Sequence, residues 1–288
     1  MQQAVCKDVP EGENMADRDR LEMKYDQLKD RIASEGKAAI AFSGGVDSVF
    51  LLYAAKEALG DQVLALTVSL HAMPEKELRE AEEFCKQHQI RHRVETVDEF
   101  SIEGFAQNPP DRCYLCKKAL FQRMLLAAGE EGFLILMEGS NMDDQGDYRP
   151  GLRALRELRI QSPLKDAGFS KAEIREMSRR LSLPSWEKPS MACLASRFVY
   201  GERITPERMK MVELAEEYLT DMGFIQRRVR MHGMLARIEL LPEELPHIMK
   251  EGIYRKVCDR FLELGFSYVT LDLNGFESGS MNKGLDTE

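Results

Sequence analysis

A run of small apolar residues ends in the hexapeptide Ser-Gly-Gly-Val-Asp-Ser, which begins at Ser43 and combines two glycines with two hydroxyls and a carboxylate. Gly44 and Gly45 permit a sharp turn that brings backbone N–H groups close to a ligand. The hydroxyls of Ser43 and Ser48 add donors, and a helix starting near Asp47 directs its positive end to the same place. The hexapeptide therefore predicts a phosphate-binding loop, with a simple tight turn as the alternative. It is not a Walker A loop, because no Gly-Lys-Ser/Thr follows.

Cys113 and Cys116 have the spacing Cys-x-x-Cys at the expected start of a helix. A helix N-terminus and the neighbouring cations of Arg112, Lys117 and Lys118 favour the thiolate form of a cysteine. The pair could be half of a metal site, half of a cluster site or a redox pair, and the alternative is two half-buried thiols on a helix. The sequence has no second pair of this spacing to complete a zinc site with four cysteine ligands.

Cys193 lies in an aperiodic stretch between Leu183 and Glu202, which is longer than a compact domain normally leaves without a function. Its small neighbours leave room for a ligand. The cations of Lys188 and Arg197 stand nearby, and cations lower the pKa of a thiol. The stretch therefore predicts a reactive cysteine, and the alternative is a buried structural one.

Arg228 and Arg230 are two residues apart in an expected strand, so their side chains point to the same face. Two adjacent guanidinium groups suit a phosphate or a carboxylate. The alternative is a solvated strand face.

Asp143 and Asp144 follow another expected strand, at the edge of the sheet where ligands bind. A contact to Mg²⁺ or to a ribose is one interpretation of this pair. The other is that both are solvated loop acids.

Strands alternate with helices in the first half of the chain, which predicts an α/β fold with a doubly wound parallel sheet. Ligands of such sheets bind at the carboxyl ends of the strands, where the hexapeptide lies. The expected strands are residues 37–42, 62–68, 91–97 and 133–139, and the expected helices are 17–34, 48–59, 75–89, 116–132 and 170–182.

The pattern restarts after Thr205 as helix, two strands, helix and strand, which predicts a small α+β domain. The strands of this domain are expected at residues 227–232, 234–241 and 268–273. We expect a disordered segment at 1–16, the main domain at 17–183, an active-site loop or linker at 184–204, the small domain at 205–275 and a loose tail at 276–288.

The composition excludes several classes of protein. The 288 residues carry a net charge of −9, which argues against a nucleic-acid binder. The chain shows neither a secretory signal nor an apolar run near the roughly 18 residues of a membrane span. These features predict a soluble cytoplasmic protein, whose six cysteines are thiols or ligands rather than disulfides.

The hexapeptide in its strand–turn–helix context resembles the PP-loop of the N-type ATP pyrophosphatases, which have the adenine nucleotide alpha hydrolase-like fold. Together with residues 108–121, 138–154, 188–205 and 227–240, it closely resembles the LarE-type sulfur transferases. The resemblance extends from about residue 20 to 273, motif by motif and in order.

That resemblance implies the substrate pyridinium-3,5-biscarboxylic acid mononucleotide and a place in the biosynthesis of the nickel-pincer nucleotide cofactor of lactate racemase. ATP adenylates each carboxylate in turn, and the PP-loop holds the departing pyrophosphate. Asp47 matches a Mg²⁺ contact, and Arg228 and Arg230 match positions that grip the substrate phosphate. Ser196 and Arg197 would orient the adduct.

The source of sulfur stays open under the resemblance. In the simplest members of the family, the cysteine matching Cys193 attacks the acyl-adenylate and gives up its own sulfur. Resemblance to a subset with three cysteines implies instead a [4Fe–4S] cluster with one open iron. Cys113, Cys116 and Cys193 would be the ligands here, and we expect them to converge in space.

The resemblance also implies a homo-oligomer, a trimer or a hexamer, assembled through the small domain. A nickel-inserting enzyme of the same pathway is the implied partner. Two other functions remain as alternatives: a PP-loop tRNA thiolase, and a non-catalytic module that binds ATP or a protein partner. The acidic net charge argues against a tRNA thiolase. The intact PP-loop and cysteine motifs argue against a non-catalytic module.

Overall fold

The computed structural model describes residues 15–71, 73, 75–144, 150–188, 193–277 and 279–281. Most of the N-terminal segment and most of the tail, for which the sequence predicts disorder, lie outside these residues.

The first sheet has four strands in the order β3-β2-β1-β4, and every neighbouring pair is parallel. The chain winds away from β1 in both directions, which leaves a switch point between β1 and β4. The predicted α/β class with a parallel sheet is confirmed. The strands are β1 (Ala38–Ala41), β2 (Val63–Ser69), β3 (Arg91–Thr96) and β4 (Leu136–Met137).

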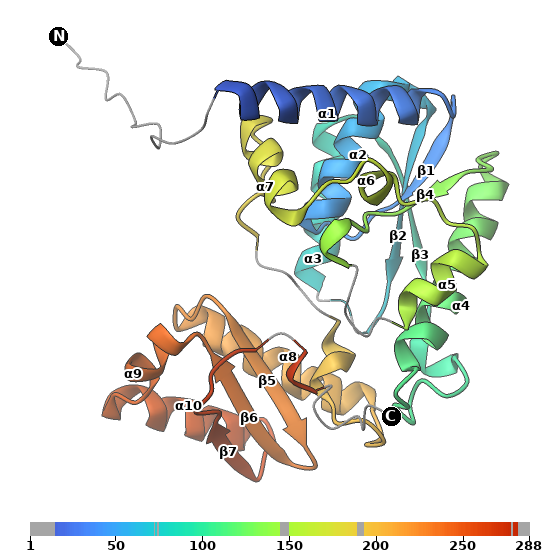
Figure 1. Cartoon of the computed structure of the whole chain (residues 1–288). Coiled ribbons are helices and arrows are strands. Elements are labelled where there is room, and N and C mark those ends of the chain that lie inside the picture. The colour runs from blue at the N-terminus through green and yellow to red at the C-terminus, as the bar shows by residue number, and fades with distance from the viewer. Residues whose placement is uncertain are drawn as a thin grey trace, which may run out of the picture.

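Helices cover both faces of this sheet (Figure 1). Ala38 and Ile40 point into the core on one face, and Ala39 points into the core on the other, as the pleat requires. The first core is closed by α1 (Met15–Ala33), α2 (Val46–Leu59), α3 (Glu75–Gln87), α6 (Pro163–Asp166) and α7 (Lys171–Arg180). The second core is closed by α4 (Arg112–Glu130) and α5 (Gly151–Glu157).

Local sequence sets the helix ends as expected. Gly60 ends α2 with a positive φ of 58°, which suits glycine, and its N–H bonds to the carbonyl of Lys56. Ser170 starts α7 with a capping box, in which its hydroxyl and the carboxylate of Glu173 bond each other's backbone N–H.

The segment 133–139 differs from its prediction as a full strand, because only Leu136–Met137 pair. The N–H of Phe133 bonds to the carbonyl of Ala128 at 2.8 Å, so this residue closes the last turn of α4 instead. Helices α5 and α6 were not predicted, because seven and four residues are too short to show a helical period.

A second sheet lies in the C-terminal part of the chain, below the first in Figure 1. Its order is β5-β6-β7, with an antiparallel first pair and a parallel second pair. The small α+β arrangement after Thr205 is therefore confirmed. Its elements are α8 (Pro206–Asp221), β5 (Arg227–His232), β6 (Leu235–Leu240), α9 (Leu245–Ile248), α10 (Glu251–Glu263) and β7 (Tyr268–Leu271).

The core of the second sheet extends into the loop between β3 and α4. Phe105 is part of that core, and Leu70, Phe100 and Cys116 pack against it. The start of α4 is therefore held against the C-terminal elements, while the exact domain boundaries at 183–184 and 204–205 stay predictions. No helix among the described residues is long and apolar enough to cross a membrane.

Candidate active site

The Ser-Gly-Gly-Val-Asp-Ser loop joins β1 to α2 at the carboxyl edge of the sheet. Gly44 has φ of 74°, a conformation that suits glycine. The hydroxyls of Ser43 and Ser48 lie 3.1 Å apart, and that of Ser48 also donates to the carbonyl of Gly45 at 3.0 Å. A β-carbon on Gly139, just after β4, would lie 3.1 Å from the backbone nitrogen of Ser48. Close packing at the switch point therefore depends on this glycine.

Two side chains from the far side of the switch point hold Asp47. The ammonium group of Lys171, at the start of α7, bonds to the Oδ2 atom of Asp47, and the amide of Asn141 donates to Oδ1 at 3.3 Å. These two bonds fix the orientation of the Asp47 carboxylate within the loop.

Asp143 and Asp144 act as caps in the loop after β4. The backbone N–H of Lys171 donates to Asp143 at 2.7 Å, and that of Asn141 donates to Asp144 at 2.9 Å. These bonds position the two residues that hold Asp47. A direct contact of Asp143 or Asp144 to Mg²⁺ or ribose stays a prediction.

Lys188 ties the segment before Cys193 to the PP-loop. Its ammonium group donates to the carbonyl of Gly44 at 3.3 Å and pairs with Glu77 and Glu80 of α3 at 2.5 and 2.7 Å. Five residues of extended chain span at most about 17 Å, so the backbone of Cys193 lies within that distance of Lys188.

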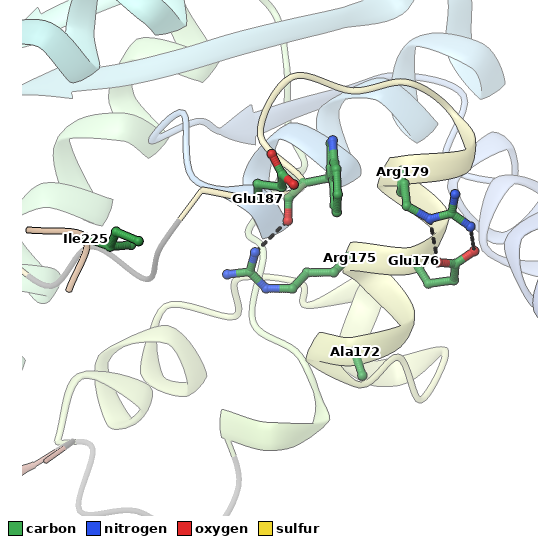
Figure 2. Close-up of a pocket in the computed structure, with 7 residues that line it drawn as sticks. Ala172, Arg175, Glu176, Arg179, Glu187 and Ile225 are labelled. Carbon is green, nitrogen blue, oxygen red and sulfur yellow. Dashed lines mark hydrogen bonds and ion pairs between the residues drawn. The ribbon is translucent and has the colours of Figure 1, made fainter. Parts of the chain in front are cut away.

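Arg175 of α7 holds the same segment by donating to the backbone carbonyls of Trp186 at 2.5 Å and Lys188 at 2.7 Å. Figure 2 shows it beside a pocket of about 670 Å³, in which Arg179 pairs with Glu176. None of the predicted site residues lines that pocket. Arg175 therefore supports the segment that carries Lys188 rather than the chemistry itself.

The three predicted cysteines come together at the start of α4. Cys113 and Cys116 lie in its first two turns, and Cys193 precedes the short 3-10 helix Leu194–Arg197. Cys116 lies near enough to Cys193 and Cys113 for their charges to raise its pKa. Cys193 reaches solvent although protein surrounds it on most sides, so it is not the buried structural residue of the alternative. Their convergence as ligands of one cluster stays a prediction.

The prediction that neighbouring cations favour the thiolate is wrong for Cys116 and Cys193 in the protein alone. Burial raises the pKa of Cys116, and the charges of Cys193, Cys113 and Glu99 add to the effect, although Arg112 opposes it. Burial also raises the pKa of Cys193, against the opposing effects of Arg112 and Arg197. Desolvation of the charged form outweighs the neighbouring cations.

Arg112 links the helix that carries Cys113 and Cys116 to the segment that carries Cys193. Its guanidinium group donates to the carbonyl of Ala195 at 2.8 Å and to the side chain of Asn108. Asn108 in turn donates to the carbonyl of Val199 at 2.6 Å. This chain of bonds fixes the two cysteine-bearing segments relative to each other.

Arg197 and Arg230 hold the same segment from the other side. Arg197 is fully buried, pairs with both carboxylate oxygens of Glu216 at 2.8 and 3.0 Å, and donates to the carbonyl of Cys193 at 3.3 Å. Arg230 pairs with Glu239 at 2.9 Å and donates to the carbonyl of Ser196 at 3.1 Å. The backbone around Cys193 is thus held by three arginines, counting Arg112.

Arg228 and Arg230 do not form the solvated face of the alternative, because their exposed fractions are only 6% and 5%. Burial and the nearby charges of Arg197 and Arg230 lower the pKa of Arg228 to about 10, although Glu216 opposes this. The positive charges of Arg228 and Arg230 therefore lie close together with little access to water, and a bound anion would stabilise them.

We expect Arg197→Ala to lower the free energy of unfolding by about 3–5 kcal/mol, because it leaves the buried carboxylate of Glu216 without its guanidinium partner. Urea denaturation followed by circular dichroism measures this. The control is Arg255→Ala. The side chains of Arg255 and its partner Glu251 are 66% and 78% exposed, so their ion pair should contribute less than about 1 kcal/mol. Equal effects of the two substitutions would contradict the account.

The effect of Arg197→Ala should shrink in acid. Burial alone would raise the pKa of Glu216, but Arg197 outweighs it and holds the pKa below the ordinary value of 4.5. A lowered pKa stabilises the folded state above about pH 4.5, and this contribution is lost as the pH falls through the folded-state value. If the difference in free energy of unfolding between the parent protein and Arg197→Ala stays constant in acid, the ion pair is not its cause.

Sequence reasoning missed Lys171, Asn141 and Gly139, and it gave no role to Glu216 or Glu239. Lys171 lies 124 positions from Asp47, so no local pattern could connect them. The two glutamates lie in regular elements, where acidic residues are ordinarily solvent-exposed. Only the capping pattern at Ser170, one residue before Lys171, marked that lysine's position at a helix N-terminus.

The parallel sheet, with this loop after its first strand, defines a PP-loop ATP-binding domain, and the PP-loop domain family matches residues 18–147. The pyridinium-3,5-bisthiocarboxylic acid mononucleotide synthase of Lactiplantibacillus plantarum is 35% identical over 251 residues, 86% of this chain and 90% of its own. An uncharacterised protein of Synechocystis is 38% identical over 92% of this chain and 99% of its own. A glutamine-hydrolysing GMP synthase polypeptide of Thermoplasma acidophilum is 27% identical over 68% of each chain. The chain belongs to the family of LarE-type, ATP-dependent sulfur transferases.

Proposed function

We propose that this enzyme adenylates the carboxylates of pyridinium-3,5-biscarboxylic acid mononucleotide with ATP and converts them to thiocarboxylates. The observation that carries the proposal is the meeting of Cys113, Cys116 and Cys193 beside the buried cations Arg228 and Arg230. The name of the Lactiplantibacillus relative, a synthase of the bisthiocarboxylic acid mononucleotide, gives a product whose two thiocarboxylates would derive from the two carboxylates of this substrate.

The residues of the PP-loop carry out the adenylation step. A carboxylate is a poor electrophile, and its acyl-adenylate has AMP as a far better leaving group. The N–H groups of Gly44 and Gly45, with the hydroxyls of Ser43 and Ser48, bind the pyrophosphate that departs. Asp47 would hold Mg²⁺, and a bound Mg²⁺ would supply positive charge to offset the charge that develops on the phosphates.

Arg228 and Arg230 bind the phosphate of the substrate mononucleotide. The nearby charges of Arg197 and Arg230 lower the pKa of the buried Arg228. A phosphate bound there would offset this repulsion between guanidinium groups. Ser196 and Arg197, next to Cys193, orient the adduct.

The three cysteines fit a [4Fe–4S] cluster better than a single metal ion. Among the described residues, their sulfurs do not form a group whose members all lie within 4.8 Å, as ligands of one ion would. A cluster spreads its thiolate ligands over several iron atoms, so they stand farther apart. When bound through Cys113, Cys116 and Cys193, a cluster would supply an exchangeable sulfide and keep the thiols deprotonated.

The alternative source is the sulfur of Cys193 itself, which would leave dehydroalanine in the chain. Mass spectrometry of the protein after one turnover distinguishes the two sources. A loss of about 34 Da at Cys193, the mass of H₂S, indicates the sacrificial route. An unchanged mass, with iron–sulfur absorbance that Cys113→Ala removes, indicates the cluster route.

The reaction places the enzyme in the biosynthesis of the nickel-pincer nucleotide cofactor of lactate racemase, where a nickel-inserting enzyme would take its product. Its free thiols and its use of ATP suit the reducing cytoplasm. A homo-oligomer, trimer or hexamer, would assemble through the C-terminal elements.

The test is release of AMP and pyrophosphate from ATP and Mg²⁺, with and without the pyridinium mononucleotide. We expect release to require this substrate. Stimulation by tRNA instead would favour a tRNA thiolase, and ATP binding with no release under any condition would favour a non-catalytic module.

We expect Arg228→Ala to weaken binding of the substrate mononucleotide about tenfold or more, since a charge-assisted bond contributes roughly 1.5–3 kcal/mol. ATP affinity should not change. Calorimetry with the mononucleotide and with its dephosphorylated nucleoside measures the effect, and Arg255→Ala serves as the exposed control. An equal loss for the nucleoside would show that Arg228 does not bind the phosphate.

A further inference from the structure

A histidine and two carboxylates meet at the carboxyl ends of β2 and β3, outside the PP-loop, and one of the carboxylates, Glu99, lies near enough to Cys116 to raise its pKa. His71 follows β2, and Asp98 and Glu99 follow β3. The Nδ1 atom of His71 lies 3.2 Å from Oε2 of Glu99 and 3.9 Å from Oδ1 of Asp98, and the three ligand atoms all lie within 4.8 Å of one another.

These separations suit a single metal ion. Nitrogen and oxygen ligands stand about 2.0–2.2 Å from Zn²⁺, so two ligands of one ion can be no more than about 4.4 Å apart. Both distances from the imidazole fall below that limit. Two carboxylates also balance the charge of a divalent cation, which a buried carboxylate particularly requires.

The surroundings hold the three side chains in place. Glu99 is fully buried and accepts the backbone N–H of His71 at 3.1 Å. Asp98 accepts the backbone N–H of Phe100 at 2.9 Å, and the ring of Phe100 packs edge-on against the imidazole at 5.6 Å. A ligand set held in this way loses little conformational entropy when it binds an ion.

A pocket of about 460 Å³ opens beside the cluster. His71 and Asp98 line it, together with Lys210 and Glu213 of α8. Three protein ligands with an open side are typical of cation sites that keep an exchangeable water or anion.

We propose that His71, Asp98 and Glu99 bind one divalent transition-metal ion of the Zn²⁺, Co²⁺ or Mn²⁺ type, with an exchangeable position toward this pocket. Imidazole selects such ions over Mg²⁺, which prefers oxygen ligands alone. The site is separate from the Mg²⁺ that accompanies ATP at Asp47.

The test is titration of the full chain with Co²⁺, whose visible absorption reports its ligands. A parent protein with Cys113, Cys116 and Cys193 replaced by Ser removes competing thiol ligands. We expect this parent to bind one Co²⁺ per chain, and His71→Gln or Asp98→Asn to weaken binding at least about tenfold. Both side chains are half-exposed, so neither substitution should disturb folding.

The matched control is His247→Gln, an exposed histidine in the C-terminal elements, which should bind Co²⁺ like the parent. Excess Mg²⁺ should not displace the ion. Binding that is unchanged in His71→Gln, or that disappears with the three cysteines, would overturn the proposal. Because the readout is metal binding, the result is independent of the proposed sulfur transfer.

Discussion

Asp47→Asn is expected to reduce substrate-dependent pyrophosphate release by about 10²-fold to 10³-fold, the usual cost of removing one electrostatic contact to a transition state. The amide keeps the shape of the side chain but loses the charge that would hold Mg²⁺ against the phosphates. Release of labelled pyrophosphate, with ATP and the mononucleotide both saturating, measures the effect.

The fold should survive this substitution, because the Asp47–Lys171 pair is partly exposed and contributes little stability. The matched control is Asp61→Asn, an exposed acid just beyond the other end of α2 that pairs with Lys56. It should release pyrophosphate at the normal rate. Full activity of Asp47→Asn would remove Asp47 from the proposed site.

Cys193→Ser is expected to abolish thiocarboxylate formation while the first substrate carboxylate is still adenylated. A serine hydroxyl is neither a thiolate nucleophile nor a source of sulfur, and it is a poor cluster ligand. A single turnover followed by chromatography should therefore show AMP and pyrophosphate without a sulfur-containing product.

Two companion variants make this result specific. Cys258→Ser, a partly buried cysteine on α10, should transfer sulfur normally. Cys113→Ser should lose transfer if a cluster supplies the sulfur and retain it if Cys193 is consumed. Thiocarboxylate formation by Cys193→Ser would contradict both routes.

The sheet could be predicted because each of its elements carries a local signal. Short buried strands alternate with helices whose ends are marked by residues such as Gly60 and Ser170, and these patterns do not depend on distant contacts. Short helices such as Gly151–Glu157 contain too few residues to show a helical period. The length of β4 depends on its pairing with β1, a long-range contact that no local pattern encodes.

The residues of the site also differ in whether the sequence alone could predict them. The PP-loop and the Cys-x-x-Cys pair are contiguous motifs, so their residues could be named from the sequence. The pKa values of Cys116 and Cys193 could not, because burial outweighs the neighbouring cations and depends on the packing of both sheets. The bond of Arg112 to the carbonyl of Ala195 joins residues 83 positions apart and was equally inaccessible.

Sulfur incorporation coupled to ATP cleavage tests the central proposal most directly. The full chain, prepared without oxygen, is mixed with ATP, Mg²⁺ and pyridinium-3,5-biscarboxylic acid mononucleotide, and the small molecules are analysed by mass spectrometry. The account predicts thiocarboxylate in proportion to AMP and pyrophosphate, and none when ATP is omitted. Formation of AMP and pyrophosphate with both carboxylates unchanged, or of thiocarboxylate without ATP, would contradict it.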